Sequence, residues 1–174
     1  MPMKSYKEKL PAITTFIFDI DGVFTTGEVF VFNGEFVRNI QSKDAYALQY
    51  AKKMGFQLFI ITGGESLLLK QVLENLGITN VYLKSANKLI VYEDIKKKYN
   101  LKDEEILYMG DDIPDYKVLE RCGVSSCPQD AAIEIKRICD YQSPLDGGKC
   151  CVRDVIEQTM KVQQKWFTEE SFIW

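Results

Sequence analysis

The chain has 174 residues, 46% hydrophobic and 27% charged, a composition typical of globular proteins that excludes collagen-like and disordered chains. Lysine and arginine total 22 against 25 aspartates and glutamates, so the formal net charge of −3 provides no basic surface for nucleic acid. Histidine is absent, which excludes a Ser-His-Asp triad and the histidine-containing zinc motifs.

The cysteines and the N-terminal segment indicate the compartment. The five cysteines have no Cys-x-x-Cys spacing and are expected to be reduced thiols. The first ten residues are too polar for a signal peptide, and no apolar run reaches the roughly 18 residues of a membrane helix. We therefore expect a cytoplasmic protein with no membrane partner.

The first elements along the chain are a strand, a hairpin and a helix. Residues 14–20 are β-branched and aromatic, which predicts a buried strand. Asn33-Gly34 predicts a β-hairpin over residues 28–39, because both central positions of a type I′ turn need positive φ. Ser42 is expected to cap a helix over residues 43–54.

The later segments continue this alternation. Further strands are expected over residues 57–61, 80–83, 105–109 and 124–127. Further helices are expected over residues 66–76, 87–99, 115–121, 131–138 and 152–165. This order predicts one α/β domain over residues 1–174, with a doubly wound, mostly parallel sheet and helices on both faces. The aromatic tail, residues 166–174, is expected to pack in an oligomer, with disorder as the alternative.

Polar residues follow the predicted strands at the edge where α/β proteins bind ligands. In chain order these residues are Asp19 and Asp21, Thr62-Gly63-Gly64, Lys88, and Asp111, Asp112 and Asp115. Two carboxylates about 5 Å apart repel by roughly 3 kcal/mol at an effective dielectric constant of 20, so this cluster needs a cation. Oxygen ligands with room for water favour Mg²⁺.

Such a group of side chains is suited to phosphoryl transfer. A carboxylate can attack phosphorus in line, while the cation and the lysine neutralise the phosphoryl oxygens and a second carboxylate handles the proton.

The four motifs resemble those of the haloacid dehalogenase-like hydrolases, whose sequences carry Asp-x-Asp, Ser/Thr, Lys and a Gly-Asp-Asp-x-x-Asp group. The resemblance implies that Asp19 is the nucleophile that forms an aspartyl-phosphate. It implies that Asp21 protonates the leaving alcohol and then activates water. Thr62 would hydrogen-bond the phosphoryl group, and Lys88 would balance its charge.

The same resemblance implies the metal ligands. Asp19, Asp111 and the backbone carbonyl of Asp21 would hold Mg²⁺. Asp112 and Asp115 are expected around these ligands rather than on the ion.

The spacing of the motifs leaves no room for a cap domain. The intervals between Asp21 and Thr62 and between Thr62 and Lys88 are both too short for one. A capless enzyme leaves its site open to water, so it acts on a macromolecule or borrows a lid from another subunit. The hairpin over residues 28–39, apolar on both faces, is the candidate for that contact; alternatively, both faces pack within one chain.

Within the family the chain resembles the 3-deoxy-D-manno-octulosonate 8-phosphate phosphatases, through Asp-Ile-Asp-Gly-Val-Phe-Thr, Asn-Lys, Gly-Asp-Asp-Ile-Pro-Asp-Tyr and Gly-Gly near the C-terminus. This resemblance implies a homotetramer that removes phosphate from an eight-carbon keto-sugar acid of lipopolysaccharide synthesis. Its implied substrate contacts are Lys43, Asp44 and Gly63.

The residues after Thr62-Gly63 depart from this pattern. Many members have arginine next, whereas this chain has Gly64 and Glu65, so another cation has to hold the substrate carboxylate. The candidates are Lys43, Lys84, Arg153 or a residue of a neighbouring subunit. A phosphatase of nine-carbon nonulosonate 9-phosphates, whose branch has glutamate near this position, is the alternative. A phospho-accepting regulatory switch domain is the alternative from another class of protein.

Overall fold

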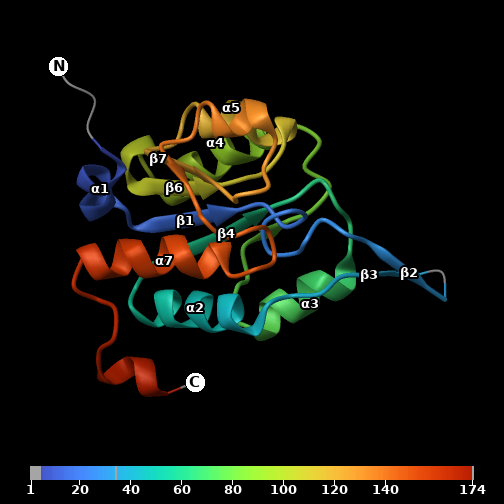
Figure 1. Ribbon diagram of the computed structural model, residues 1–174, viewed down its shortest axis with the longest axis horizontal. Helices are drawn as coiled ribbons and strands as arrows, with labels where there is room; N and C mark the ends of the chain where they lie inside the picture. The colour runs from blue at the N-terminus through green and yellow to red at the C-terminus, as the bar shows by residue number, and fades with distance from the viewer. Residues whose placement is uncertain (1–4, 34, 174) are drawn as a thin grey trace.

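The structure is a computed structural model that describes residues 5–33 and 35–173 (Figure 1). Its centre is a six-stranded sheet in the order β5-β4-β1-β6-β7-β8, and all neighbouring strands are parallel. The strands are β1 (Thr15–Phe18), β4 (Gln57–Ile61), β5 (Val81–Tyr82), β6 (Ile106–Met109), β7 (Val124–Cys127) and β8 (Tyr141–Gln142). The chain builds the sheet outward on one side of β1 and then returns to its other side, so the topological switch point lies between β1 and β6.

Helices cover both faces of the sheet (Figure 1). They are α1 (Tyr6–Lys9), α2 (Ser42–Lys53), α3 (Leu67–Asn75), α4 (Lys88–Tyr99), α5 (Tyr116–Leu119), α6 (Ile133–Lys136) and α7 (Cys151–Val162). Short 3₁₀ helices are η1 (Leu10–Ala12), η2 (Asp103–Glu105), η3 (Ile113–Asp115) and η4 (Glu169–Phe172). No helix formed by the described residues has the length and apolar character needed to cross a membrane.

Alternating side chains of the buried strands face two hydrophobic cores. Phe16 and Phe18 of β1 belong to the core that α2, α3 and α7 cover, whereas Ile17 belongs to the core beneath α4, α5 and α6. This period of two is the one expected of a strand buried on both faces. The predicted doubly wound parallel fold is confirmed, and the described chain inserts no cap domain between β1 and α2 or between β4 and α4.

The helix starts follow capping chemistry in two cases and depart from the prediction in a third. Ser66 Oγ accepts a hydrogen bond from Leu69 N at 3.2 Å, and Asn87 Oδ1 accepts one from Ile90 N at 3.4 Å. Ser42 is not a cap, because α2 begins at this residue and the preceding Gln41 makes no capping side-chain bond. The two-residue strand β8 and the four-residue helix α1 are too short for periodicity to reveal.

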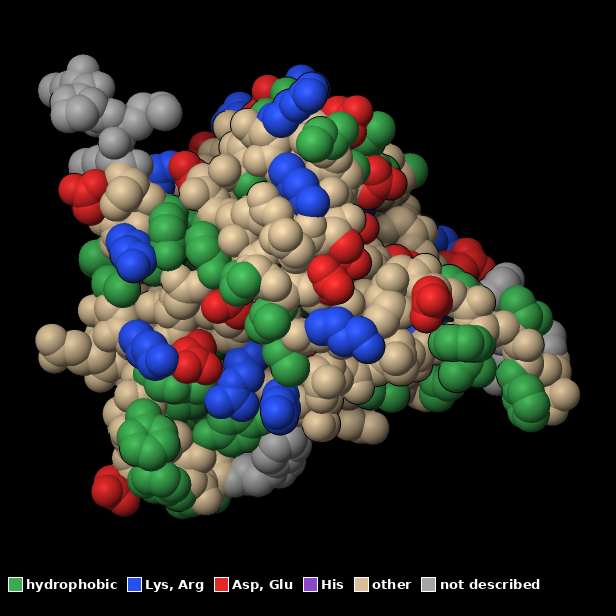
Figure 2. All heavy atoms as spheres, viewed as in Figure 1, with side chains coloured by type: hydrophobic (Ala, Val, Ile, Leu, Met, Phe, Trp, Pro, Cys, Tyr) green, Lys and Arg blue, Asp and Glu red, His purple; other side chains and the backbone are tan. Residues whose placement is uncertain are grey.

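A hairpin of β2 (Phe30–Phe32) and β3 (Glu35–Val37) projects from the body of the molecule (Figure 1). Asn33 in its turn has the expected positive φ of 50°, and Gly34 lies outside the described residues. The exposed apolar side chains on both faces, 41–71% accessible, are Val29, Phe30, Val31, Phe32 and Val37. They form much of the apolar surface at that end of the molecule in Figure 2. Packing of both faces within one chain, the alternative interpretation, is therefore wrong.

The C-terminal tail packs on α2 of its own chain. Tyr50 OH lies 3.0 Å from the carbonyl oxygen of Lys165, and the Tyr50 ring lies 5.4 Å from that of Trp166. Tyr46 OH donates to the carbonyl oxygen of Ser171. The described part of the tail thus contacts its own chain, and its packing in an oligomer stays a prediction; residue 174 lies outside the described residues.

Candidate active site

The carboxyl edge of the sheet carries a pocket of about 450 Å³ at the switch point. Asp19 directly follows β1, and its backbone N–H donates to the carbonyl oxygen of Met109 at the end of β6. Most of the residues predicted from the motifs line this pocket, namely Asp19, Asp21, Thr62, Gly63, Lys88, Asp111, Asp112 and Asp115. The motifs at the strand ends therefore meet at this edge of the sheet, as predicted.

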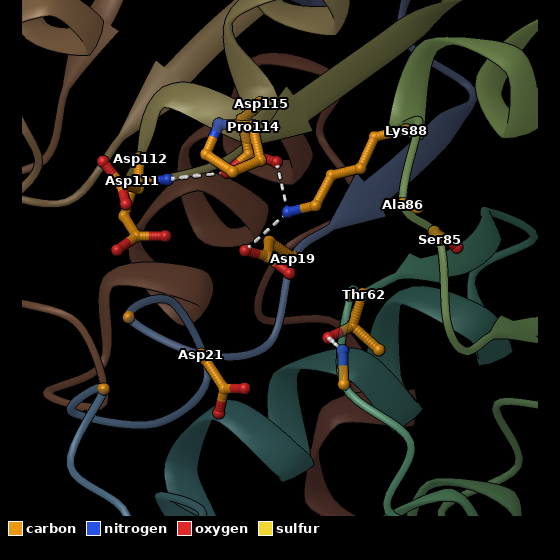
Figure 3. A pocket seen from close by; sticks show the side chains of 14 residues that line it. Asp19, Asp21, Thr62, Ser85, Ala86, Lys88, Asp111, Asp112, Pro114 and Asp115 are labelled. Carbon is orange, nitrogen blue, oxygen red and sulfur yellow. Dashed lines mark hydrogen bonds and ion pairs between the residues drawn. The ribbon is translucent and has the colours of Figure 1, made fainter.

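Lys88 joins two of the carboxylates (Figure 3). Its Nζ lies 2.8 Å from Asp19 Oδ2 and 2.7 Å from Asp115 Oδ1. The lysine is the first residue of α4, so the cap at Asn87 fixes where its side chain enters the pocket. Only 5% of the Lys88 side chain is exposed, so water screens these pairs weakly.

Asp115 is fully buried and binds three groups of this cluster through its side chain. Its Oδ1 accepts hydrogen bonds from Lys88 Nζ at 2.7 Å and from Tyr108 OH at 2.5 Å. Its Oδ2 accepts a bond from the backbone N–H of Asp111 at 3.3 Å. Both oxygens are engaged, as expected for a residue beside a metal site rather than on it. Asp112, in contrast, is exposed at the pocket rim.

Burial and mutual repulsion perturb these carboxyl groups. Burial, and then the charge of Asp115, raise the pKa of Asp19 to about 7, although Lys88 opposes the shift. Burial, followed by the charges of Asp19 and Asp115, raises the pKa of Asp111 to about 7. Burial would lower the pKa of Lys88, but the carboxylates of Asp115 and Asp19 raise it overall. The site therefore holds more negative charge than one ammonium group neutralises.

Two buried oxygens show that these residues fit a divalent cation. Asp19 Oδ1 and Asp111 Oδ1 have no hydrogen-bond partner in the described part of the chain. One oxygen from each of Asp19, Asp111 and Asp115 lies within 4.8 Å of the others. Because Asp115 already uses both oxygens, the unpartnered oxygens of Asp19 and Asp111 are the ones suited to Mg²⁺.

Asp21 has a partner that no sequence motif predicted. Arg38, directly after β3, places Nε 2.6 Å from Asp21 Oδ1 and Nη2 3.1 Å from Asp21 Oδ2. Thr25 Oγ1 adds a longer bond of 3.4 Å to the same Oδ1. No motif spacing indicates Arg38, because its approach depends on the path of the hairpin back to the β1 loop.

Thr62 follows β4 on the side of the pocket opposite Asp111 (Figure 3). Its Oγ1 accepts a hydrogen bond from Gly64 N at 3.1 Å, which fixes the side chain of Thr62 at the pocket wall. The backbone of Ser85 donates to the carbonyl oxygen of Thr62 at 2.9 Å. This bond joins the loop after β4 to the segment that leads into α4.

The structure places two predicted substrate contacts outside the pocket lining. Lys43 is exposed at the start of α2. Asp44 is fully buried, and its Oδ1 accepts a hydrogen bond from Arg153 N at 2.7 Å at the start of α7. Burial raises the pKa of Asp44 to about 6, although the backbone bond from Arg153 opposes the shift. Asp44 thus holds α2 and α7 together, and this burial leaves no surface for a substrate contact.

Lys84 and Arg153, the other two candidates for holding the substrate carboxylate, pair with other side chains. Lys84 forms an ion pair of 2.7 Å with Glu65 near the pocket rim, with both side chains well exposed. Arg153 pairs with Glu157 at 3.3 Å and stacks its guanidinium 5.4 Å from the ring of Trp166.

Comparisons with known proteins show the family to which the chain belongs. A family model for haloacid dehalogenase-like hydrolases matches residues 42–123. The chain is 32% identical over 158 residues to the 3-deoxy-D-manno-octulosonate 8-phosphate phosphatase of Escherichia coli strain K12, covering 90% of this chain and 84% of that protein.

Two crystal structures share the fold closely. The phosphatase of the same name from Yersinia pestis has a TM-score of 0.90 at 28% identity, covering 92% of this chain and 87% of that one. The Moraxella catarrhalis phosphatase, in complex with magnesium ion, phosphate ion and KDO molecule, has a TM-score of 0.90 at 27% identity, covering 92% and 93%. The chain therefore belongs to the haloacid dehalogenase-like hydrolase family, on its phosphatase branch.

Proposed function

We propose that this chain hydrolyses a phosphate monoester in the presence of Mg²⁺ through an aspartyl-phosphate on Asp19. The observation that carries the proposal is the buried cluster in which Lys88 lies 2.8 Å from Asp19 and 2.7 Å from Asp115, with one oxygen each of Asp19 and Asp111 left without a partner. The unpartnered oxygens of Asp19 and Asp111, together with the backbone carbonyl of Asp21, would hold Mg²⁺.

The reaction then follows from the positions of these side chains. Asp19 attacks phosphorus, the bond to the leaving oxygen breaks, and Asp21 gives that oxygen a proton. Asp21 next takes a proton from the water that attacks the aspartyl-phosphate, which releases inorganic phosphate. Lys88 and Thr62 bind the phosphoryl oxygens, and a bound Mg²⁺ supplies further positive charge against their developing negative charge.

The proposed substrate is 3-deoxy-D-manno-octulosonate 8-phosphate, an eight-carbon sugar acid. The Escherichia coli relative and the structural neighbours that bear this name support the choice, since the chain matches them over most of its length. Glu65, ion-paired with Lys84 near the rim, is the observation that keeps a nine-carbon nonulosonate 9-phosphate as second candidate.

We further propose that the enzyme is a homotetramer in the cytoplasm. The described residues form no cap over the pocket, and they leave apolar side chains on both faces of the hairpin uncovered. A second copy that buries this hairpin would both remove an exposed apolar surface and shield the pocket from water.

Steady-state kinetics with Mg²⁺ test the activity and the substrate. Sustained release of phosphate is expected, with higher kcat/KM on the eight-carbon than on the nine-carbon sugar-acid phosphate. A higher kcat/KM on the nine-carbon compound would reverse the substrate assignment. A stable phosphoprotein without turnover would instead identify a regulatory switch domain.

A further inference from the structure

Arg38, at the end of the hairpin, points back toward the body of the molecule and binds Asp21. Arg38 comes directly after β3, and its guanidinium binds both oxygens of Asp21 through Nε at 2.6 Å and Nη2 at 3.1 Å. Only 13% of the Arg38 side chain is exposed. This fork-on-fork geometry is the strongest arrangement available to an arginine and a carboxylate, and it fixes the carboxylate plane as well as its position.

Arg38 also borders an apolar groove. Arg38 lies beside Val37 and Ile40 in a groove that Leu69 and Val72 of α3 complete. Apolar walls of this kind suit the methylene stem of an arginine whose charged head lies elsewhere. Arg38 thus borders both this groove and the Asp21 carboxyl group.

Gly64 lies beside the ion pair of Arg38 and Asp21. A Cβ atom on Gly64 would lie 3.7 Å from Arg38 Nη2 and 3.7 Å from Asp21 Oδ2. Both distances are ordinary van der Waals contacts, so residue 64 borders the ion pair without crowding it.

We propose that Arg38 is a positioning residue that fixes the orientation of the Asp21 side chain for the second half of the reaction. This inference rests on the proposed function. In that half, water forms a bond to phosphorus, the bond between phosphorus and the Asp19 oxygen breaks, and the water proton passes to Asp21. Two hydrogen bonds from one guanidinium fix where the oxygens of Asp21 lie, and a base held in place takes the proton faster than one that is displaced.

The test separates the two half-reactions with p-nitrophenyl phosphate, whose leaving group departs without a proton. The Arg38→Gln variant is expected to form the aspartyl-phosphate at a near-normal rate and to hydrolyse it about 10- to 100-fold more slowly, as misplacement of a reacting group does. Rapid mixing should then show a burst of p-nitrophenol in proportion to enzyme, followed by slow turnover. The wild-type enzyme, measured under the same conditions, should show a smaller burst.

Three further variants make the result specific. Arg38→Lys keeps the charge but not the fork, so its hydrolysis rate should lie between those of the wild type and Arg38→Gln, and it also serves if the glutamine variant does not fold. Arg121→Gln removes an arginine from the surface pairs with Glu93 and Asp103 and should behave as the wild type. Asp21→Asn should show the burst most strongly.

The possible outcomes test the role of Arg38 separately from the proposed phosphatase function. A burst with Asp21→Asn but none with either Arg38 variant would overturn the role of Arg38 alone. Equal slowing of both half-reactions by Arg38→Gln would indicate a structural role for Arg38 and would also overturn the proposed positioning role. Undiminished turnover by Asp21→Asn would contradict the proposed function itself.

Discussion

Replacement of Lys88 by methionine should remove the only positive charge that the described residues place against Asp19 and Asp115. The lysine is 5% exposed, and its contacts to the two carboxylates are 2.8 and 2.7 Å. Loss of one partner from a buried ion pair costs about 3–5 kcal/mol, because the remaining charge stays out of water without compensation. We therefore expect Lys88→Met to lower the free energy of unfolding by about 3–5 kcal/mol at neutral pH with Mg²⁺ chelated.

Urea denaturation followed by tryptophan fluorescence, at fixed protein concentration, measures this loss. Addition of Mg²⁺ to about 100 times its dissociation constant should return roughly 2.7 kcal/mol, whereas phosphatase activity should stay lost because no ammonium group binds the phosphoryl oxygens. Lys117→Met, which removes an exposed pair of 3.0 Å with Glu120, is the control and should cost less than about 1 kcal/mol. A stability of Lys88→Met within about 1 kcal/mol of the wild type would refute the account of the cluster.

Three other substitutions give independent tests. Burial raises the folded-state pKa of Asp44 to about 6, so its contribution to stability is fully present below about pH 4 and is lost as the pH rises through 6. An asparagine at this position does not titrate, so Asp44→Asn should not lose this stability as the pH rises. Between about pH 4 and pH 7 the unfolding free energy of the variant, relative to that of the wild type, should therefore rise by about 2 kcal/mol. Parallel curves for the two proteins would contradict the raised pKa of Asp44. Gly147→Ala should lower both stability and kcat, since its Cβ would lie 2.0 Å from the carbonyl oxygen of Gly22 in the loop after Asp21. Thermal melts comparing it with Gly63→Ala, where nothing lies within 4 Å of the added atom, should show a large loss only for Gly147→Ala. Tyr50→Phe should cost about 1 kcal/mol and increase proteolysis of the C-terminal tail, and unchanged protease sensitivity would count against the docking of the tail.

The main part of the site could be predicted because parallel strands end at a common edge. Asp19, Thr62 and Asp111 each follow a strand of strong apolar character, so their order along the chain was enough to bring them together. Lys88 could be predicted on the same ground, as the first residue of the helix that leaves this edge.

Other parts of the site depend on tertiary packing that no local pattern encodes. Arg38 reaches Asp21 only because the hairpin returns toward the loop after β1, and the approach of an isolated arginine has no sequence signature. The sequence neighbours Lys43 and Asp44 were expected to contact substrate, yet the packing of α2 on α7 turns Asp44 inward to cap α7. The start of α2 at Ser42 shows the usual uncertainty of a helix end, where neighbouring residues compete for the cap.

The identity of the nucleophile is the central claim, and trapping the phosphoenzyme tests it most directly. Borohydride added during turnover reduces an acyl phosphate, and peptide mass spectrometry then locates the altered residue. We predict that the modification falls on Asp19 alone, requires substrate and is absent from Asp19→Asn. Modification of Asp21 or Asp111 instead, or sustained hydrolysis by Asp19→Asn, would contradict the account.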